Sequence, residues 1–89
     1  MHVKKIVMFT LATCPYCKAA LRYMDKLAAK NPEYGALEIE KIDESIYPDV
    51  AGQYDYHYVP TYYVDGEKLH EGAANLDAVK RVFDAALEG

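Results

Sequence analysis

Apolar and polar residues follow two different periods along the chain, which predicts both strands and helices. Residues Val3 to Phe9 are rich in branched and aromatic side chains, which favours a strand. After Pro15 the period becomes helical, until Asn31-Pro32 ends it. The apolar residues at helical spacing are Ala20, Leu21, Met24, Leu27 and Ala28. The first third of the chain therefore predicts a strand followed by a helix that begins near Pro15.

The middle of the chain predicts a second strand and a short helix. Residues Ala36 to Ile42 alternate between apolar and charged side chains, as a half-buried strand does. Pro48 has a fixed φ that suits the first turn of a helix, and the negative charge of Asp49 is favourable there. We therefore expect a short helix from Pro48 to Tyr54.

The last third predicts a hairpin and a final helix. Thr61–Val64 and Glu67–Glu71 flank Asp65-Gly66, which is the strongest short-range signal for a hairpin. Asn75 can cap a helix whose buried face holds Leu76, Val79, Val82, Phe83, Ala86 and Leu87. The predicted order is βαβαββα in one domain, residues 1–89, with no internal repeat or linker. The first βαβ unit implies a parallel strand pair with a right-handed crossover, and the hairpin adds antiparallel strands.

Composition and charge narrow the classes of protein that the chain can be. Of its 89 residues 52% are hydrophobic, which is ample for one small folded domain. No apolar run approaches the roughly 20 residues of a membrane span. The start, MHVKKIVMFT, lacks a small-residue cleavage site, so we expect a strand there and not a signal peptide. The net charge of −4 argues against nucleic acid or an anionic membrane as a partner.

The two cysteines, Cys14 and Cys17, are separated only by Pro15 and Tyr16. Two cysteines are too few for a disulfide scaffold, so we expect a reducing, cytoplasmic setting. We also expect a monomer. As zinc ligands they would form half a site, and the histidines that could complete it are far apart in the sequence. A structural disulfide closing so short a loop would restrain the unfolded chain little. The remaining interpretation is a pair that makes and breaks a disulfide.

The redox interpretation has a physical mechanism. If the helix begins near Pro15, which costs little at a first helical position, Cys14 lies at its N-terminus. Unpaired N–H groups and the helix dipole favour a thiolate there, and such placement lowers a cysteine pKa to between ~3.5 and ~7.5. Cys14 can then attack a substrate disulfide. Cys17, one turn into the helix, can attack the mixed disulfide and release the product.

These features together resemble the thioredoxin superfamily over nearly the whole chain. The matching order is strand, Cys-Pro-Tyr-Cys, helix, strand, short helix, Val59-Pro60-Thr61, hairpin and helix. The resemblance implies a thioredoxin fold, an α/β protein in which three helices flank a four-stranded mixed sheet. The tetrad at positions 14–17 is that of dithiol glutaredoxins. The resemblance also implies that Pro60 is a cis-proline facing the cysteines and that the Val59 backbone pairs with a bound peptide or glutathione.

The chain also departs from both branches of the superfamily. Glutaredoxins usually have two glycines and acidic residues that hold glutathione, where this chain has Glu71-Gly72-Ala73-Ala74-Asn75. Leu11 replaces their lysine, which meets a glutathione carboxylate. Thr13 replaces the tryptophan of thioredoxins, and Met8 replaces their buried aspartate, so a general base for Cys17 cannot be carried over. The electron donor stays open between glutathione and a reductase of the thioredoxin-reductase type.

Other residues near the motif have a functional and a structural interpretation. We expect Tyr16 to contact substrate, because a loop with working thiols must be exposed. Lys18 and His57 are more simply explained as solvated side chains, and Gly72 as a backbone requirement. A partial aromatic rim for a peptide is an alternative interpretation of four tyrosines, but packing in a half-buried sheet explains at least two of them: Tyr56, Tyr58, Tyr62 and Tyr63.

The sequence therefore predicts a thiol–disulfide oxidoreductase with Cys14 as nucleophile and Cys17 as resolving thiol. Its substrates would be protein disulfides or glutathione mixed disulfides. No organic or metal cofactor is needed, because the cysteines carry the electrons. Two rival interpretations are a glutaredoxin-type iron–sulfur or metal-handling protein and a non-catalytic binding module on the same fold.

Overall fold

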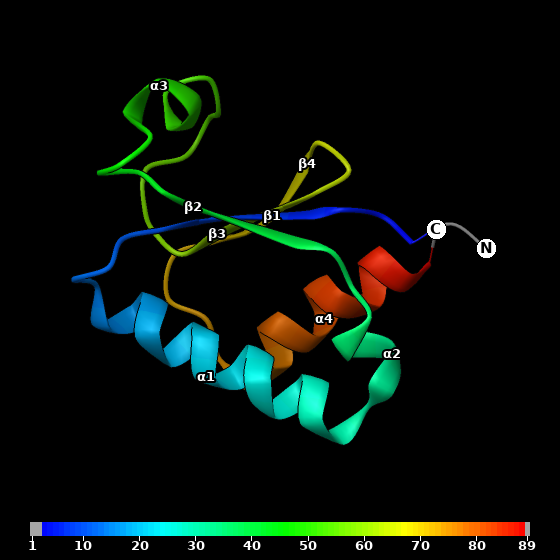
Figure 1. Cartoon of the computed structure of the whole chain (residues 1–89). Helices are drawn as coiled ribbons and strands as arrows, with labels where there is room; N and C mark the ends of the chain where they lie inside the picture. The colour runs from blue at the N-terminus through cyan, green and yellow to red at the C-terminus, as the bar shows by residue number, and fades with distance from the viewer. Residues whose placement is uncertain (1–2, 89) are drawn as a thin grey trace.

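A four-stranded mixed sheet has helices on both of its faces (Figure 1). The computed structural model describes residues 3–88. Its elements are β1 (Ile6–Thr10), α1 (Pro15–Lys30), α2 (Pro32–Gly35), β2 (Ile39–Asp43), α3 (Pro48–Ala51), β3 (Thr61–Val64), β4 (Glu67–Glu71) and α4 (Leu76–Leu87). The strand order is β2-β1-β3-β4, with β1 parallel to β2 and antiparallel to β3, and β3 antiparallel to β4. The expected parallel pair extended by an antiparallel hairpin is confirmed.

The sequence predicts three helices, and the structure has four within residues 3–88. The additional helix is α2, which follows α1 at once. The Asn31 side chain accepts a hydrogen bond from the Glu33 N–H at 3.0 Å, and Pro32 occupies the first helical position. The same Asn-Pro pair thus ends one helix and begins the next, because a residue that cannot continue a helix is well suited to start one.

The first two strands are shifted from their predicted bounds. β1 begins at Ile6 rather than Val3 and extends to Thr10 rather than Phe9, because pairing with β2 runs from Ile6 to Thr10. Pairing with β3 covers only Ile6 to Phe9. Lys4 instead donates its N–H to the Ala86 carbonyl. β2 runs from Ile39 to Asp43 rather than from Ala36 to Ile42. Ala36 is the C-cap of α2, and residues 37–38 connect that helix to the strand. α3 is also shorter than predicted and ends at Ala51.

The hairpin and the last helix have the predicted bounds. Asp65 and Gly66 both have positive φ, at 51° and 85°, as a two-residue hairpin turn requires. The Asn75 side chain accepts a hydrogen bond from the Ala78 N–H at 2.8 Å and so caps α4. The Asp65-Gly66 turn and the Asn75 cap, both recognisable from the sequence, thus end and begin these elements where the folded structure does.

The two faces of the sheet bury different cores. Figure 1 shows α1 and α4 below the sheet and α3 above it. The lower face is aliphatic for the most part and includes Ile6, Met8, Ala20, Met24, Leu27, Tyr62, Val64, Val79, Val82 and Phe83. The upper face is aromatic and includes Phe9, Ile42, Ala51 and Tyr63, with Tyr54 and Tyr56 packed against them. Aromatic rings thus fill the part of this face that the short helix α3 leaves uncovered. The rings of Phe9 and Tyr56, for example, stack with their centroids 4.8 Å apart.

Candidate active site

The strand directions bring four connecting segments to one end of the sheet. β1 and β2 are parallel and both end there, β3 runs the opposite way and begins there, and β4 ends there. The same end of the sheet, which is the left end in Figure 1, therefore holds four segments: residues 11–14, 44–47, 57–60 and 72–75. Both cysteines belong to this end, since α1 begins directly after residue 14.

Cys14 occupies the N-cap position of α1. Its backbone is extended, with φ −84° and ψ 118°, and its carbonyl accepts the first helical hydrogen bond, from the Lys18 N–H at 3.2 Å. Pro15 follows at the first helical position, as predicted. Both thiols are free, and Cys14 is partly exposed whereas Cys17 is buried with 1% of its surface exposed. An incoming disulfide can therefore reach Cys14 first.

The two thiols differ in acidity. Partial burial alone would raise the pKa of Cys14, but hydrogen bonds from the Cys17 N–H and thiol and from the Tyr16 N–H outweigh it, so the net pKa lies below the ordinary value. Burial raises the pKa of Cys17, and hydrogen bonds from the Thr10 hydroxyl and the Leu11 N–H offset only part of that rise. The predicted roles, thiolate for Cys14 and protonated thiol for Cys17, agree with these directions.

The segment before β3 lies directly beside the nucleophile. The Cys14 Sγ is 3.9 Å from the Val59 carbonyl oxygen. The Val59–Pro60 bond is cis, as the family resemblance implies. The Pro60 carbonyl accepts a hydrogen bond from the Gly72 N–H at 2.9 Å, and Gly72 has a φ of +92° that favours glycine. Gly72 is thus a backbone requirement, and it supports the proline loop from the β4 side.

Two side chains hold the loop that leads into Pro60. The buried Thr61 hydroxyl donates a hydrogen bond to the Tyr58 carbonyl at 2.5 Å. The Glu71 carboxylate accepts the N–H groups of His57 and Tyr58, at 2.5 and 3.0 Å. Sequence reasoning missed Glu71, because the contact joins residues that are far apart in the chain and only the β3–β4 pairing brings them together.

A further carboxylate that sequence reasoning missed holds the loop in front of Cys14. Asp43 ends β2 and accepts the Ala12 N–H at 3.2 Å. It also accepts the N–H and the hydroxyl of Ser45, at 2.8 and 2.6 Å. An aspartate two residues before a serine is a known turn signal, but only the parallel pairing of β1 and β2 shows that this turn also binds the segment before Cys14.

The candidate contact residues divide into exposed and buried groups. The Tyr16 side chain is 60% exposed beside the thiols, and Tyr58 is 70% exposed. Lys18 and His57 are exposed as well, in agreement with their solvated interpretation. Tyr62 and Tyr63 are buried in the two cores, so packing explains at least these two tyrosines. The roles of Tyr16, Val59, Pro60 and Thr61 toward a substrate stay predictions.

No carboxylate lies under the resolving thiol at the position where the superfamily has one. That position is Met8, which is fully buried in the aliphatic core. The groups that donate hydrogen bonds to Cys17 include the Thr10 hydroxyl and the Leu11 N–H, and neither is a general base at neutral pH.

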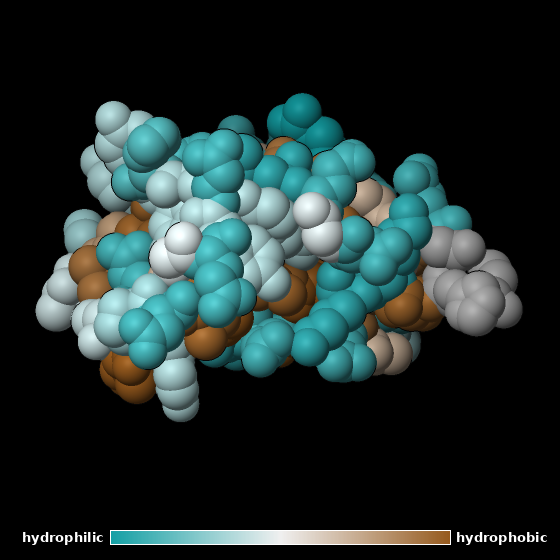
Figure 2. Space-filling model, turned by 90° about the horizontal axis from the view of Figure 1, so that it is seen from above, coloured by the Kyte–Doolittle hydropathy of each residue, from teal (hydrophilic) through white to brown (hydrophobic). Residues whose placement is uncertain are grey.

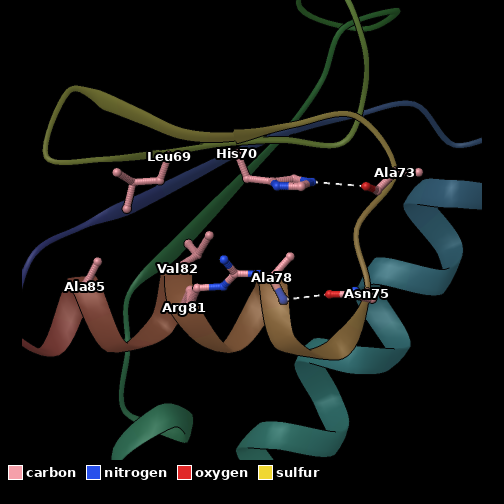
Figure 3. A pocket seen from close by; sticks show the side chains of 8 residues that line it. All are labelled: Leu69, His70, Ala73, Asn75, Ala78, Arg81, Val82 and Ala85. Carbon is pink, nitrogen blue, oxygen red and sulfur yellow. Dashed lines mark hydrogen bonds between the residues drawn. The ribbon is translucent and has the colours of Figure 1, made fainter.

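Two cavities of the structure lie away from the thiols. A groove of about 430 Å³ runs between β4 and α4, past His70 and Arg81 (Figure 3), and a second cavity of about 240 Å³ lies beside Tyr34. Neither is lined by Cys14 or Cys17. Within residues 3–88, no cluster of three or more His, Cys, Asp or Glu side chains could hold a metal ion. No helix in this part of the chain has the length and apolar character needed to cross a membrane.

Comparisons with known proteins agree with this arrangement. The model of the glutaredoxin family matches residues 6–69. A thioredoxin of Methanocaldococcus jannaschii is 35% identical over 79 residues, which cover 89% of this chain and 91% of that protein. A probable thioredoxin of Methanothermobacter marburgensis is also 35% identical, over 97% of this chain and 99% of its own length.

Among solved structures, oxidized mitochondrial thioredoxin 3 from Saccharomyces cerevisiae superimposes with a TM-score of 0.72. The match covers 96% of this chain and 80% of that one at 23% identity, which supports the fold. The fold, the dithiol and the family match together lead to one conclusion: the chain belongs to the glutaredoxin family, within the thioredoxin superfamily, and is a thiol–disulfide oxidoreductase.

Proposed function

We propose that the chain reduces disulfide bonds in proteins and receives its electrons from a reductase of the thioredoxin-reductase type. The observation that carries this proposal is the position of Val59 beside the nucleophile, with its carbonyl 3.9 Å from the Cys14 Sγ. Within residues 3–88, neither the N–H nor the C=O of Val59 takes part in a backbone hydrogen bond. An extended substrate segment can therefore pair with Val59 as a strand would, with its disulfide over Cys14.

The reaction consists of two thiol–disulfide exchanges. The Cys14 thiolate attacks one sulfur of the substrate disulfide, a mixed disulfide forms, and the other substrate sulfur leaves as a thiolate. Cys17 loses its proton and attacks the Cys14 sulfur, which releases the second substrate thiolate and leaves a Cys14–Cys17 disulfide. The substrate disulfide has then gained two electrons and, after protonation, is a pair of thiols. The donor returns the two electrons to the protein.

The preference for a reductase over glutathione follows from what surrounds the thiol. Leu11 stands where the lysine of glutaredoxins would meet a glutathione carboxylate, and Ala73 and Ala74 stand where their second glycine and acidic residues would be. The match to the glutaredoxin model ends at residue 69, before this segment. Two relatives that are 35% identical, over 89% and 97% of this chain, are named thioredoxin and probable thioredoxin. Each of these observations weakens glutathione binding or favours a thioredoxin-type donor.

An assay with two donors in parallel tests the proposal. A peptide disulfide is reduced either with NADPH and a thioredoxin reductase or with glutathione and its reductase, with Cys14→Ser as the inactive control. We expect faster turnover with thioredoxin reductase. Faster turnover with glutathione would refute the proposed donor, and no turnover with either donor would refute the proposed activity.

The proposal extends to the setting in which the protein works. Two free cysteines in a disulfide reductase suit a reducing compartment, so we propose a cytoplasmic protein that takes part in electron transport and cell redox homeostasis. We also propose that it acts as a monomer, because the chemistry needs only the two thiols of one chain. Sedimentation of the reduced protein tests the oligomeric state, and a stable dimer would refute this part.

A further inference from the structure

His70 holds the short segment between β4 and α4. Its ring lies on the side of the sheet that faces α4, where it lines the groove between these two elements (Figure 3). The Nε2 atom is 3.1 Å from the Gly72 carbonyl oxygen and 3.1 Å from the Ala73 carbonyl oxygen. Because both partners can only accept a hydrogen bond, Nε2 is the donor, and the neutral ring is the Nε2–H tautomer.

A bulge in β4 turns the His70 ring toward this segment. Tyr62 of β3 pairs with His70 and Tyr63 pairs with Lys68, so Leu69 is an extra residue in β4. Strict alternation would place Leu69 and His70 on opposite faces of the sheet, but both of them line the groove. The other face of the molecule, seen from above in Figure 2, is covered mostly by hydrophilic side chains. The bulge thus aims the ring at the α4 side.

The segment that His70 holds is also the one that supports the proline loop. The Gly72 N–H donates to the Pro60 carbonyl at 2.9 Å, and the preceding carbonyl, that of Val59, is 3.9 Å from the Cys14 Sγ. Gly72 has a φ of +92°. A glycine adopts positive and negative φ about equally readily, so it does not select this conformation by itself. A hydrogen bond to its carbonyl group selects one conformation, and the His70 ring provides that bond.

We propose that His70 is a positioning residue for the reaction: by holding the Gly72 carbonyl it directs the Gly72 N–H toward Pro60 and so fixes the loop with which an extended substrate pairs. This inference rests on the proposed function and adds to it a residue outside the thiol motif. The ring is well placed for this role, because the buried Tyr62 ring lies on the sheet beside it, with the two ring centroids 6.5 Å apart.

The groove allows His70 to be changed without a clash, because about 430 Å³ of space lies beside the ring. His70→Leu removes the donor and keeps a side chain of moderate size. His70→Gln is the rescue variant, since its amide N–H is as many bonds from the backbone as the imidazole Nε2–H. Arg81→Leu is the control variant. Arg81 lines the same groove, but its Nε donates to the Asp77 carbonyl of its own helix, at 3.5 Å.

Two disulfides that release the same chromophore separate positioning from general damage to the site. One is a peptide whose cysteine forms a mixed disulfide with thionitrobenzoate, and the other is the symmetrical disulfide of thionitrobenzoate, which has no peptide groups to pair with Val59. In His70→Leu the rate constant with the peptide should fall about five-fold, the size of one lost hydrogen bond, while that with the symmetrical disulfide stays unchanged. His70→Gln and Arg81→Leu should keep both rate constants. The Gly72 amide should also exchange its hydrogen faster in His70→Leu than in Arg81→Leu.

A His70→Leu protein that keeps its rate constant with the peptide, or that loses the same factor with both disulfides, would overturn the positioning role and leave the proposed function intact. Nitrogen NMR of the unaltered protein tests the contact without any variant. The Nε2–H tautomer of His70 is expected, and the Nδ1–H tautomer would overturn the inference because that ring cannot donate from Nε2. Failure of the unaltered protein to react with the peptide would instead refute the proposed function.

Discussion

The hydroxyl of Thr61 provides a sharp test of how the loop beside the nucleophile is held. Thr61 is fully buried at the start of β3 and donates to the Tyr58 carbonyl at 2.5 Å. Thr61→Val keeps the volume and the branched shape but removes the donor. The loss of one hydrogen bond costs about 0.5–1.5 kcal/mol, and a carbonyl left without a partner adds to it, so we expect a loss of about 1–2 kcal/mol in the free energy of unfolding.

Urea unfolding and thermal unfolding measure this loss. A domain of this size loses about 4–8 °C in Tm for each kcal/mol. Because the bond fixes the segment that leads to Val59, Thr61→Val should also raise KM for a peptide disulfide more than it lowers kcat. Thr61→Ser is the matched control, because it keeps the hydroxyl and should keep KM. If Thr61→Val matches the unaltered protein in both stability and KM, the hydroxyl does not hold the loop and the reasoning is wrong.

Three further predictions concern groups that support the site. The pKa of Glu71 is lowered to about 2, first by the Lys68 ammonium and then by the N–H groups of residues 57 and 58. Such a carboxylate stabilises the fold above its unfolded pKa of ~4.3, and this stabilisation is lost as the pH falls toward about 2. Glu71→Gln should therefore flatten the dependence of the unfolding midpoint on pH between these two values. Gly72→Ala should destabilise the fold by about 1 kcal/mol, measured by urea unfolding, because a φ of +92° disfavours any Cβ; an unchanged midpoint would contradict this. Asp43→Asn should speed hydrogen exchange at the Ala12 amide, whereas Asp49→Asn, an exposed acid on α3, should not, and equal rates in both variants would exclude the Asp43 contact.

The elements that could be predicted are those whose local and tertiary preferences agree. The hairpin at Asp65-Gly66 and the Asn75 cap of α4 are fixed by short-range chemistry, and both have the predicted bounds. β1 and β2 do not, because the ends of a strand depend on where its partners lie and not on its own side chains. α2 was missed because Asn31-Pro32 is a stop signal for one helix and a start signal for the next.

In the candidate site too, the residues of the short motif could be predicted, whereas the residues that act on distant segments of the chain could not. Cys14, Pro15 and Cys17 could be assigned from the sequence, since a short motif at a helix start sets both their spacing and their chemistry. The supports of the site could not be assigned. Asp43 and Glu71 act on segments 31 and 13–14 residues away in the chain, and only strand pairing brings these groups together.

The most direct test of the central claim, that Cys14 attacks and Cys17 resolves, is to identify the adducts of two serine variants by mass spectrometry. Each variant reacts with a peptide linked to thionitrobenzoate through a mixed disulfide. Cys17→Ser should release thionitrobenzoate and keep the peptide on Cys14, because the thiol that would release it is absent. Cys14→Ser should give no adduct under the same conditions, since the pKa of the buried Cys17 is raised. An adduct on Cys17 formed at a rate equal to that on Cys14 would contradict the assigned roles.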